Sequence, residues 1–259
     1  AASMHGIGNG YGGCLGTGVV RLLPRLNAGR TGLTEVQAQA AGYETSSVIC
    51  VVDDKAHYYP GASSFVVKLT AETASSKLLG IQVLGAGAVD KMTDIAVVGI
   101  AQGMRIDAFD TLDFAYAPPF STAIHPFVTA CYILENKISD RFTSMSPAEY
   151  ANGAAKGYTV LDVQPAPAIP NARFVELAAV NGPLEDLPKD AKLLLVCAKG
   201  KRGYFLQNRL KAIGYTHTKV LEGGAFFNDV KVPRDGKKLS PEDVKRVKGL
   251  GCLQDKRYD

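Results

Sequence analysis

The chain has 259 residues, of which 46% are hydrophobic and 21% are charged. This length accommodates one large domain or two small ones, and the composition excludes disordered, collagen-like and coiled-coil chains. The longest nearly uncharged apolar runs, Ile95 to Ala101 and Leu193 to Ala198, are far shorter than the roughly 18 residues that a membrane span requires. We therefore expect no membrane-spanning segment and no membrane partner.

The net charge of +4 is concentrated at the C-terminal end. Residues 231–259 contain nine Lys and Arg against five Asp and Glu, whereas residues 1–230 contain twenty of each. A basic segment without interleaved aromatic residues is typical of a solvated surface, so we expect no nucleic-acid partner. Ser240, Pro241 and Asp243 predict a short helix within the basic tail, residues 233–259.

Five cysteines, an odd number, lie 36 to 81 residues apart, without a CxxC pair or a cluster of His and Asp beside them. This spacing argues against a disulfide scaffold and against a metal site. The chain starts without a signal-peptide pattern, so we expect a reducing, cytoplasmic location. We expect Cys14, Cys50 and Cys131 to pack as small hydrophobic residues, and Cys252 to be either an incidental linker residue or a relay thiol.

The first half of the chain predicts an α+β domain. Four strands are expected, at 18–23, 46–53, 64–70 and 78–84, of which the last two form a hairpin. A helix over 89–103 follows, and its apolar residues at steps of three should face the sheet. Consecutive strands followed by helices favour an antiparallel sheet with helices on one face over a Rossmann fold. The expected apolar stripe consists of Met92, Ile95, Val98 and Ala101.

The second half predicts an α/β domain, a parallel sheet flanked by helices. A proline-containing loop over 116–127 and a helix from Phe127 to Asn136 lead to a domain boundary at about 139–143. Beyond it, short apolar runs alternate with helices, the pattern of a parallel sheet. Strands are expected at 159–163, 173–175, 192–197 and 218–221, and helices at 147–155 and 201–213.

The most informative segment is the apolar strand that ends at Cys197, with its following loop. Loop amides and the start of the next helix should surround the sulfur and favour an anion. Three basic residues add positive charge, which favours the thiolate, the nucleophilic form of cysteine. The plainer interpretation is a core cysteine at a strand end, which has no need of these cations. The loop residues are Ala198, Lys199, Gly200, Lys201 and Arg202.

The CxxGxR pattern from Cys197 to Arg202 resembles the active-site loop of rhodanese-type sulfurtransferases. The resemblance implies a rhodanese-like domain over 143–232, in which Cys197 takes a sulfane sulfur from a donor such as thiosulfate and passes it to a thiol acceptor. It also implies that Arg202 is catalytic, and that residues 198–201 bind the donor. The loop is one residue shorter than that of related cysteine phosphatases, which disfavours a phosphatase. Further matching segments are Leu161–Val163, Ile169–Ala172, Leu184–Asp190 and Val220–Gly224.

The second half also departs from the family pattern. Gln164 stands where the family usually has Arg, and only residues 163–168 separate Asp162 from Ile169. These differences remove one wall and one positive charge from the site. Asn171 replaces a glycine and is expected to tolerate a positive φ. We expect Asp162 to organise the strand end or the loop rather than to act as an acid or base.

The first half resembles the dimerisation domain of flavin-dependent pyridine nucleotide-disulfide oxidoreductases, in particular the coenzyme A-disulfide reductase and NADH oxidase branch. The resemblance covers residues 14–137 and implies a homodimer. In a subset of that branch the reductase is fused at its C-terminus to a rhodanese domain, the order present here. The residues that carry it are Gly32–Glu35, Ala41–Tyr43, His57–Ala62, Val89–Lys91 with Asp94, and Ala115–Ser121.

The resemblance further implies a full-length parent that uses FAD, NAD(P)H and coenzyme A, with flavin domains in cis or in trans. This chain has no strand before its only GxGxxG match at Gly8, Gly10 and Gly13, so we expect no cofactor and no oxidoreductase activity in it. The chain resembles the C-terminal portion of a longer reductase. Tyrosines of this domain reach the partner's reactive cysteine in the family, and ordinary packing is the alternative. By position they are Tyr58, with Tyr59 second, and Tyr116.

Two functions remain open from the sequence. The first is a sulfurtransferase domain joined to a reductase dimerisation domain, with a persulfide on Cys197. The second is a non-catalytic module that dimerises and docks a partner or senses sulfide, which the missing arginine at Gln164 favours. His57 and His125 are expected to be surface or loop residues without a metal.

Overall fold

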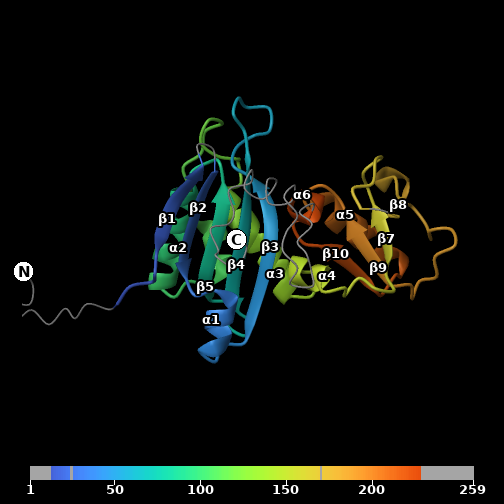
Figure 1. The fold of residues 1–259 in the computed structure, drawn as a ribbon, viewed down its shortest axis with the longest axis horizontal. Helices are drawn as coiled ribbons and strands as arrows, with labels where there is room; N and C mark the ends of the chain where they lie inside the picture. The colour runs from blue at the N-terminus through green and yellow to red at the C-terminus, as the bar shows by residue number, and fades with distance from the viewer. Residues whose placement is uncertain (1–12, 24–25, 170, 229–259) are drawn as a thin grey trace, which may run out of the picture.

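The computed structural model describes residues 13–23, 26–169 and 171–228. They form two five-stranded sheets that lie side by side, each with its own helices (Figure 1). The first sheet is antiparallel and the second is parallel, which confirms the predicted succession of an α+β and an α/β domain. The GxGxxG match up to Gly12, the basic tail and Cys252 lie outside the described residues.

The first sheet has the strand order β1-β2-β5-β4-β3. Buried and partly exposed positions alternate along β4, so one face of the sheet carries the core. The predicted hairpin of β4 and β5 is present, and all four predicted strands lie within two residues of their expected bounds. The strands are β1 (Gly18–Leu23), β2 (Leu26–Gly32), β3 (Thr45–Asp53), β4 (Ser64–Glu72) and β5 (Leu78–Gly85).

The second strand, β2, is absent from the sequence prediction. Its sequence, LNAGRTG, has no alternation of apolar and polar residues, and its pairing with β1 and β5 places it inside the sheet. Gly29 explains the composition, because a Cβ at this position would lie 2.3 Å from the Oγ1 atom of Thr93 on the covering helix. The close approach of the helix therefore requires a glycine at this position, and this glycine weakens the strand pattern in the sequence.

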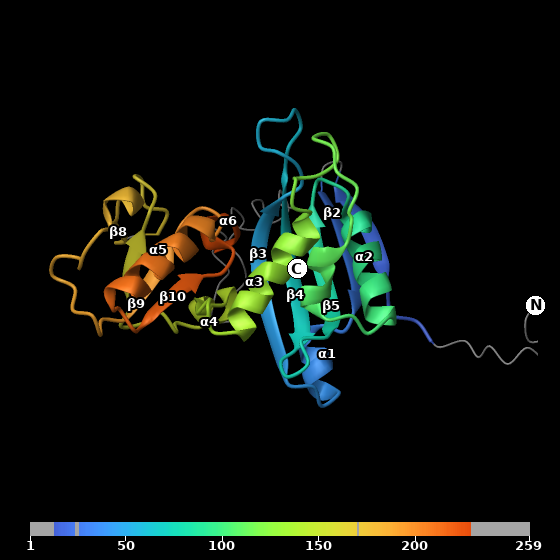
Figure 2. The same cartoon turned by 180° about the vertical axis from the view of Figure 1, so that it is seen from behind.

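Two long helices cover one face of the first sheet, as the reverse view shows (Figure 2). Helix α2 packs against β2 and β5, and α3 packs against β3 and β4. The 3₁₀ helix η2 contacts α3, and Thr34 caps α1 with a reciprocal capping box to Gln37. These elements are α1 (Glu35–Ala40), α2 (Val89–Ala101), η2 (Ile106–Thr111) and α3 (Pro126–Ile138).

The predicted stripe of α2 is only half right. Met92 is buried, whereas Val98 is 60% exposed and Ala101 is also exposed. Steps of three residues turn about 300° around a helix, so such a stripe drifts off the buried face after two steps. The observed core face is Val89, Met92, Thr93, Ala96 and Gly99.

The second sheet has the strand order β6-β10-β9-β7-β8, and all its pairs are parallel. Its central strand β9 is buried at all four positions, as expected for a strand covered on both faces. The two-residue strand β6 at the edge was not predicted, because two residues carry no periodicity. The strands are β6 (Ser144–Met145), β7 (Thr159–Asp162), β8 (Arg173–Phe174), β9 (Leu193–Val196) and β10 (Thr218–Leu221).

Helix α5 lies against β9 and β10 and matches its predicted bounds. Helix α4 is shorter than the predicted 147–155, because Asn152 ends it and Gly153 follows at a φ of 86°. Ser146 and Glu149 form a capping box at its start. The elements are α4 (Pro147–Ala151), η3 (Leu177–Ala179), α5 (Lys201–Ile213) and α6 (Gly224–Asn228).

The two domains meet where β3 and α3 of the first domain approach β6, β10 and α6 of the second (Figures 1 and 2). Phe142, in the connection after α3, makes an edge-to-face contact with Tyr204 of α5 at 5.6 Å between ring centroids. One cluster of buried hydrophobic residues continues through this junction. Among the described residues, no helix is long and apolar enough to cross a bilayer.

Candidate functional site

Cys197 follows the buried strand β9 directly, at the carboxyl end of the central strand of the parallel sheet. This edge of an open α/β sheet is where such folds place their ligands. The side chain is 2% exposed, so the loop above it controls access to the sulfur.

The loop from Cys197 to Gly200 wraps its own backbone around the sulfur. The N–H of Gly200 donates to Sγ of Cys197 at 3.0 Å. Gly200 has a φ of 99° and caps α5, which begins at Lys201. A backbone N–H and a helix N-terminus aimed at one atom stabilise negative charge there without any side chain. The sulfur and the helix start therefore meet as the sequence predicted.

Helix α6 holds the loop from the other side. The N–H groups of Ala225 and Phe226 donate to the carbonyl oxygens of Cys197 and Ala198, both at 2.8 Å. Gly224, at a φ of 55°, makes this packing possible, because a Cβ there would lie 2.3 Å from the carbonyl oxygen of Cys197. The Gly-Gly pair that closes the sequence pattern thus supports the cysteine loop.

The three basic residues of the loop face different neighbours. The ammonium group of Lys199 lies 2.5 Å from the carboxylate of Asp53 and 2.9 Å from Oγ of Ser64, both in the first domain. Lys201 lies over the ring of Phe205, 5.9 Å from its centroid. Arg202 reaches the carbonyl oxygen of Val163 at 3.5 Å. The structure places all three around the loop, and it assigns the Lys199 charge to an interdomain ion pair.

Asp162 is fully buried at the end of β7, next to the cysteine strand. Its carboxylate accepts hydrogen bonds from the backbone N–H groups of Gln164 and Ala168, each at 2.9 Å, and from the Gln164 amide. It therefore closes the short segment that replaces the longer family wall, the organising geometry expected for it. Asn171 adopts a φ of 63°, the positive value that the sequence indicated.

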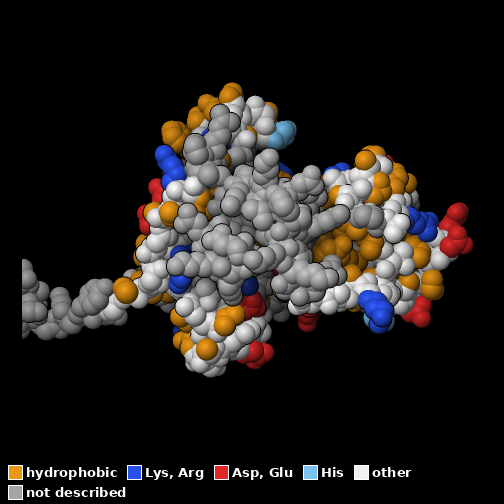
Figure 3. All heavy atoms as spheres, in the orientation of Figure 1, with side chains coloured by type: hydrophobic (Ala, Val, Ile, Leu, Met, Phe, Trp, Pro, Cys, Tyr) orange, Lys and Arg blue, Asp and Glu red, His pale blue; other side chains and the backbone are white. Residues whose placement is uncertain are grey.

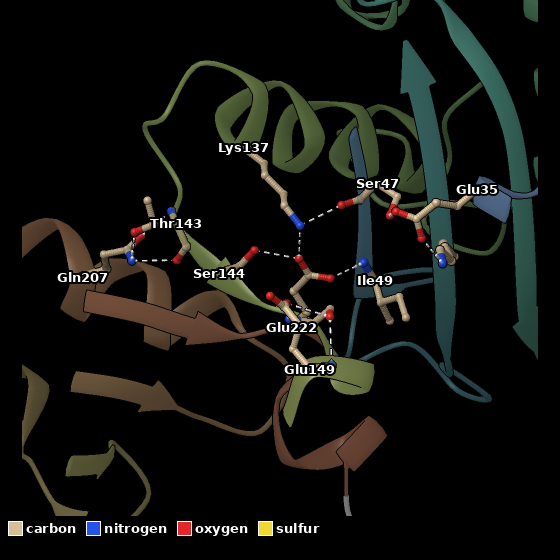
Figure 4. A network of polar contacts seen from close by, with 11 residues as sticks. Glu35, Ser47, Ile49, Lys137, Thr143, Ser144, Glu149, Gln207 and Glu222 are labelled. Carbon is tan, nitrogen blue, oxygen red and sulfur yellow. Dashed lines mark hydrogen bonds and ion pairs between the residues drawn. The ribbon is translucent and has the colours of Figure 1, made fainter. Parts of the chain in front are cut away.

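A buried carboxylate next to this site was missed by the sequence analysis. Glu222 directly follows β10, is 3% exposed and lies between the two domains (Figure 4). Its Oε1 atom accepts from Nζ of Lys137 and Oγ of Ser144, both at 2.6 Å, and its Oε2 atom accepts from the N–H of Ile49 at 2.8 Å. A buried charge is stable only when it is paired and hydrogen-bonded, as it is here.

The Glu222 network joins three elements to the support of the cysteine loop. Lys137 of α3 also donates to the carbonyl oxygen of Ser47 on β3, at 2.8 Å. Directly after Glu222 come the two glycines and the helix that bind the backbone of Cys197. The only sequence signal for it was an acidic residue between an apolar strand and a Gly-Gly pair. The first domain therefore contacts the cysteine loop in two ways. It binds Glu222, which precedes the Gly-Gly support of the loop, and it binds Lys199 of the loop itself.

The three tyrosines singled out in the sequence lie in the first domain, away from this loop. Tyr58 is 72% exposed and Tyr116 is 53% exposed, while Tyr59 is partly buried. His57 stacks edge-on against Tyr58 with 5.5 Å between ring centroids. No contact links these rings to Cys197 within the described residues. Their predicted role across a dimer stays a prediction.

The other thiols of the described chain differ from Cys197. Cys50 and Cys131 are buried as predicted, and burial raises the pKa of Cys50 to about 12 and raises that of Cys131 as well. Cys14 is exposed, so its prediction as a core residue was wrong. It precedes β1, outside the strands of the sheet. Buried thiols of raised pKa are poor nucleophiles at neutral pH, which leaves Cys197 as the one in a nucleophile-supporting loop.

His125 lies in the loop before α3, one of the two positions expected for it, and it is buried there, 5% exposed. It caps α3, where its Nδ1 atom accepts from the N–H of Phe127 at 3.2 Å, and it stacks on Phe114. Burial, with a contribution from Lys91, lowers the pKa of His125 to about 4. Among the described residues, no group of three His, Cys, Asp or Glu side chains forms a metal site.

The match to known families follows the two sheets. The family model of the pyridine nucleotide-disulphide oxidoreductase dimerisation domain matches residues 23–127, and that of the rhodanese-like domain matches residues 146–226. The chain carries a reductase dimerisation domain followed by a rhodanese-like domain. The cysteine loop, Cys197 to Arg202, falls within the rhodanese-like region.

The chain is also similar to several known proteins. The chain is 33% identical over 123 residues to an NAD(P)H coenzyme A polysulfide/persulfide reductase from Pyrococcus horikoshii, covering 48% of this chain and 27% of that protein. An NAD-dependent persulfide reductase from A. fulgidus superposes with a TM-score of 0.77 at 30% identity, over 86% of this chain and 41% of the other. A reduced CoADR-RHD protein from Bacillus anthracis gives 0.79 at 27% identity, over 87% and 41%.

The chain thus spans about a quarter of its curated relative and two fifths of these solved chains. The two matched families make it a module related to sulfurtransferases and persulfide reductases.

Proposed function

We propose that this chain is a rhodanese-type sulfurtransferase whose nucleophile is Cys197. The observation that carries the proposal is the loop in which the Gly200 N–H donates to Sγ of Cys197 at the start of α5. The Gly200 amide and the helix N-terminus stabilise the thiolate and then the anionic persulfide. Arg202 and residues 198–201 bind the anionic donor at the loop.

The reaction has two displacement steps. The Cys197 thiolate attacks the sulfane sulfur of a donor such as thiosulfate, a new S–S bond forms, and sulfite leaves with the electron pair of the broken S–S bond. An acceptor thiolate then attacks the outer sulfur of the persulfide, which releases the Cys197 thiolate and leaves the acceptor as a persulfide. No net oxidation occurs, since one S–S bond replaces another in each step.

The first domain is proposed to form the homodimer of a flavin-dependent coenzyme A-disulfide or persulfide reductase. Within the described residues, the turn after the buried parallel strand β9 carries one glycine, Gly200, rather than the three-glycine turn of a dinucleotide site. We therefore assign FAD, NAD(P)H and coenzyme A to flavin domains in cis or in trans. No step of the transfer reaction passes through them.

The alternative is a module that docks a partner or senses sulfide without turnover. The ion pair of Lys199 with Asp53 favours it, because that cation is engaged before any donor arrives. The replacement of the family's arginine by Gln164 removes a second charge. Sulfur loading of Cys197 separates the two functions.

The test is the intact mass of the reduced protein before and after incubation with thiosulfate or polysulfide. We expect a gain of one sulfur atom that a small thiol discharges and that Cys197→Ser abolishes. Cys50→Ser is the matched control, because that thiol is also buried but has no supporting loop. If Cys197→Ser gains sulfur at the wild-type rate, or if wild type gains none with either donor, the sulfurtransferase proposal is wrong and the docking module replaces it.

A further inference from the structure

A second polar site lies in the first domain, at the end where the β3–β4 loop and the loop before α3 project together (Figures 1 and 2). A cavity of about 130 Å³ opens there, large enough for a small molecule of a few heavy atoms. Apolar walls come from Phe65, Met92, Phe120 and Pro126. Space-filling Figure 3 shows His and Lys or Arg side chains near this end of the domain.

Three hydrogen-bond donors line this cavity without an acceptor. Oγ of Ser121 is buried and has no hydrogen-bond partner in the described structure. Because Nδ1 of His125 accepts from Phe127, the proton of its neutral ring lies on Nε2, which has no described partner. Lys91 forms no ion pair among the described residues, and it acts on His125 only through its charge. Of the three, the Ser121 hydroxyl is the buried one without a partner, which is costly, so an acceptor placed between it, His125 and Lys91 belongs here.

The charges of the cavity select the ligand. Asp54 is the one acidic residue in the lining, and its carboxylate already accepts from the N–H and Oγ of Ser63, with Lys55 at 3.8 Å. Lys55 offsets the charge of Asp54, which leaves Lys91 as a net positive charge beside two neutral donors. A neutral or cationic ligand would leave that charge unmatched.

We infer that the cavity lined by Lys91, Ser121 and His125 binds a small oxyanion, a carboxylate or a sulfur oxyanion. The ligand would accept hydrogen bonds from all three side chains and rest its short apolar part, if it has one, against Met92 and Phe120. The site lies in the dimerisation domain and uses none of the groups of the Cys197 loop. It stands independently of the sulfurtransferase proposal.

The test is a titration of methyl-¹³C-methionine protein with acetate and, separately, with sulfate, at constant ionic strength set by chloride. Met92 lines the cavity, and Met104 and Met145 lie elsewhere and serve as references in the same spectrum. We expect a saturable shift of the Met92 methyl signal alone. Binding of acetate only, of sulfate only or of both names the oxyanion class. If Met92 shifts no more than the two references with both anions, the site does not exist.

Lys91→Met removes the positive charge and should weaken binding about tenfold or more, since hydrogen bonds to charged groups are the strong ones. Lys77→Met removes an equal charge from an exposed position outside the cavity and should leave binding unchanged. Equal weakening by both substitutions would reduce the effect to general screening and overturn the inference.

Ser121→Ala provides a second readout that needs no anion. The variant removes a buried hydroxyl without a partner, so in the absence of anion its melting temperature should be higher than that of the wild type. Saturating anion should reduce or reverse this difference. Thr218→Val removes the other buried hydroxyl without a partner, which lies outside the cavity. Its effect should not depend on the anion. The same dependence in both variants would contradict a site at Ser121.

Discussion

The Cys197 loop and the Ser121 cavity both present hydrogen-bond donors to a small space, but they are built in different ways. At Cys197 the donor is a backbone amide, and the loop cation Lys199 is held by the neighbouring domain. At Ser121 the donors are side chains, and three of them have no described acceptor. The first site is complete without a ligand, whereas the second contains one buried hydroxyl, that of Ser121, which has no described partner.

This difference shows how support determines the use of a polar site. The cysteine loop rests on α6 and, through Glu222, on two elements of the first domain. A loop fixed on several sides holds a nucleophile in one geometry, which benefits chemistry. Among the described residues, no comparable hydrogen-bond network supports the cavity. The stability of the protein around it should therefore depend on whether a ligand is bound. The two sites should therefore respond differently to substitution and to pH.

The largest effect is expected for Glu222→Ala, which removes the support of the loop. The substitution removes the carboxylate that accepts from Lys137, Ser144 and the Ile49 N–H, and it should lower the free energy of unfolding by about 3 kcal/mol. Urea unfolding measures it. Glu35→Ala is the matched control, because its ion pair with Lys68 has the same 2.6 Å length but is partly exposed. The loss in Glu35→Ala should stay below about 1 kcal/mol. Equal losses in the two variants would mean that the buried Glu222 network stabilises the fold no more than a partly exposed ion pair does.

The second largest effect is a loss of stability at low pH, and it comes from His125, which lines the cavity. The folded-state pKa of His125, about 4, lies below the 6.5 of an unperturbed histidine, because burial disfavours the charged ring. The unfolded chain thus takes up the proton first as the pH falls. The contribution of the neutral His125 ring to the free energy of unfolding is fully present above pH 6.5 and decreases as the pH falls toward 4. At pH 5 the free energy of unfolding should be lower by about 2 kcal/mol.

His125→Asn should remove this loss, because Asn retains an acceptor for the helix cap and does not titrate. Thermal melts at pH 7 and pH 5 measure the difference. His217→Asn, at an exposed position, should keep the wild-type loss. A wild-type pH dependence in His125→Asn would show that His125 is not the titrating group.

The smallest effect concerns the Lys199–Asp53 ion pair, whose side chains are 39% and 40% exposed. Lys199→Met and Asp53→Asn should each change the free energy of unfolding by less than about 1 kcal/mol. Their effects on the donor should be opposite, since one variant removes the cation and the other frees it. We expect the KM for thiosulfate to rise about two- to fivefold in the first and to fall in the second. A change in the same direction in both would assign Lys199 a purely structural role.

Several elements could be predicted because local patterns specify them. The strands β3, β4, β5 and β10 and helix α5 are continuous apolar or periodic segments, and they appear near their predicted bounds. The strand β2 could not be predicted, because Gly29 is required by the close packing of helix α2, which follows some sixty residues later. For the same reason the buried face of α2 was misjudged. In each case the deciding contact is not in the local sequence.

The sequence by itself determined the order of the two domains and the cysteine loop, because strand, loop and helix are consecutive there and their geometry follows from spacing. The tertiary structure alone decided which charges are engaged. Lys137 and Glu222 are 85 residues apart, and Lys199 and Asp53 are 146 apart. The Ser121 cavity likewise joins three separate segments. Such pairs form only when packing brings distant elements together, and no periodicity along the chain encodes them.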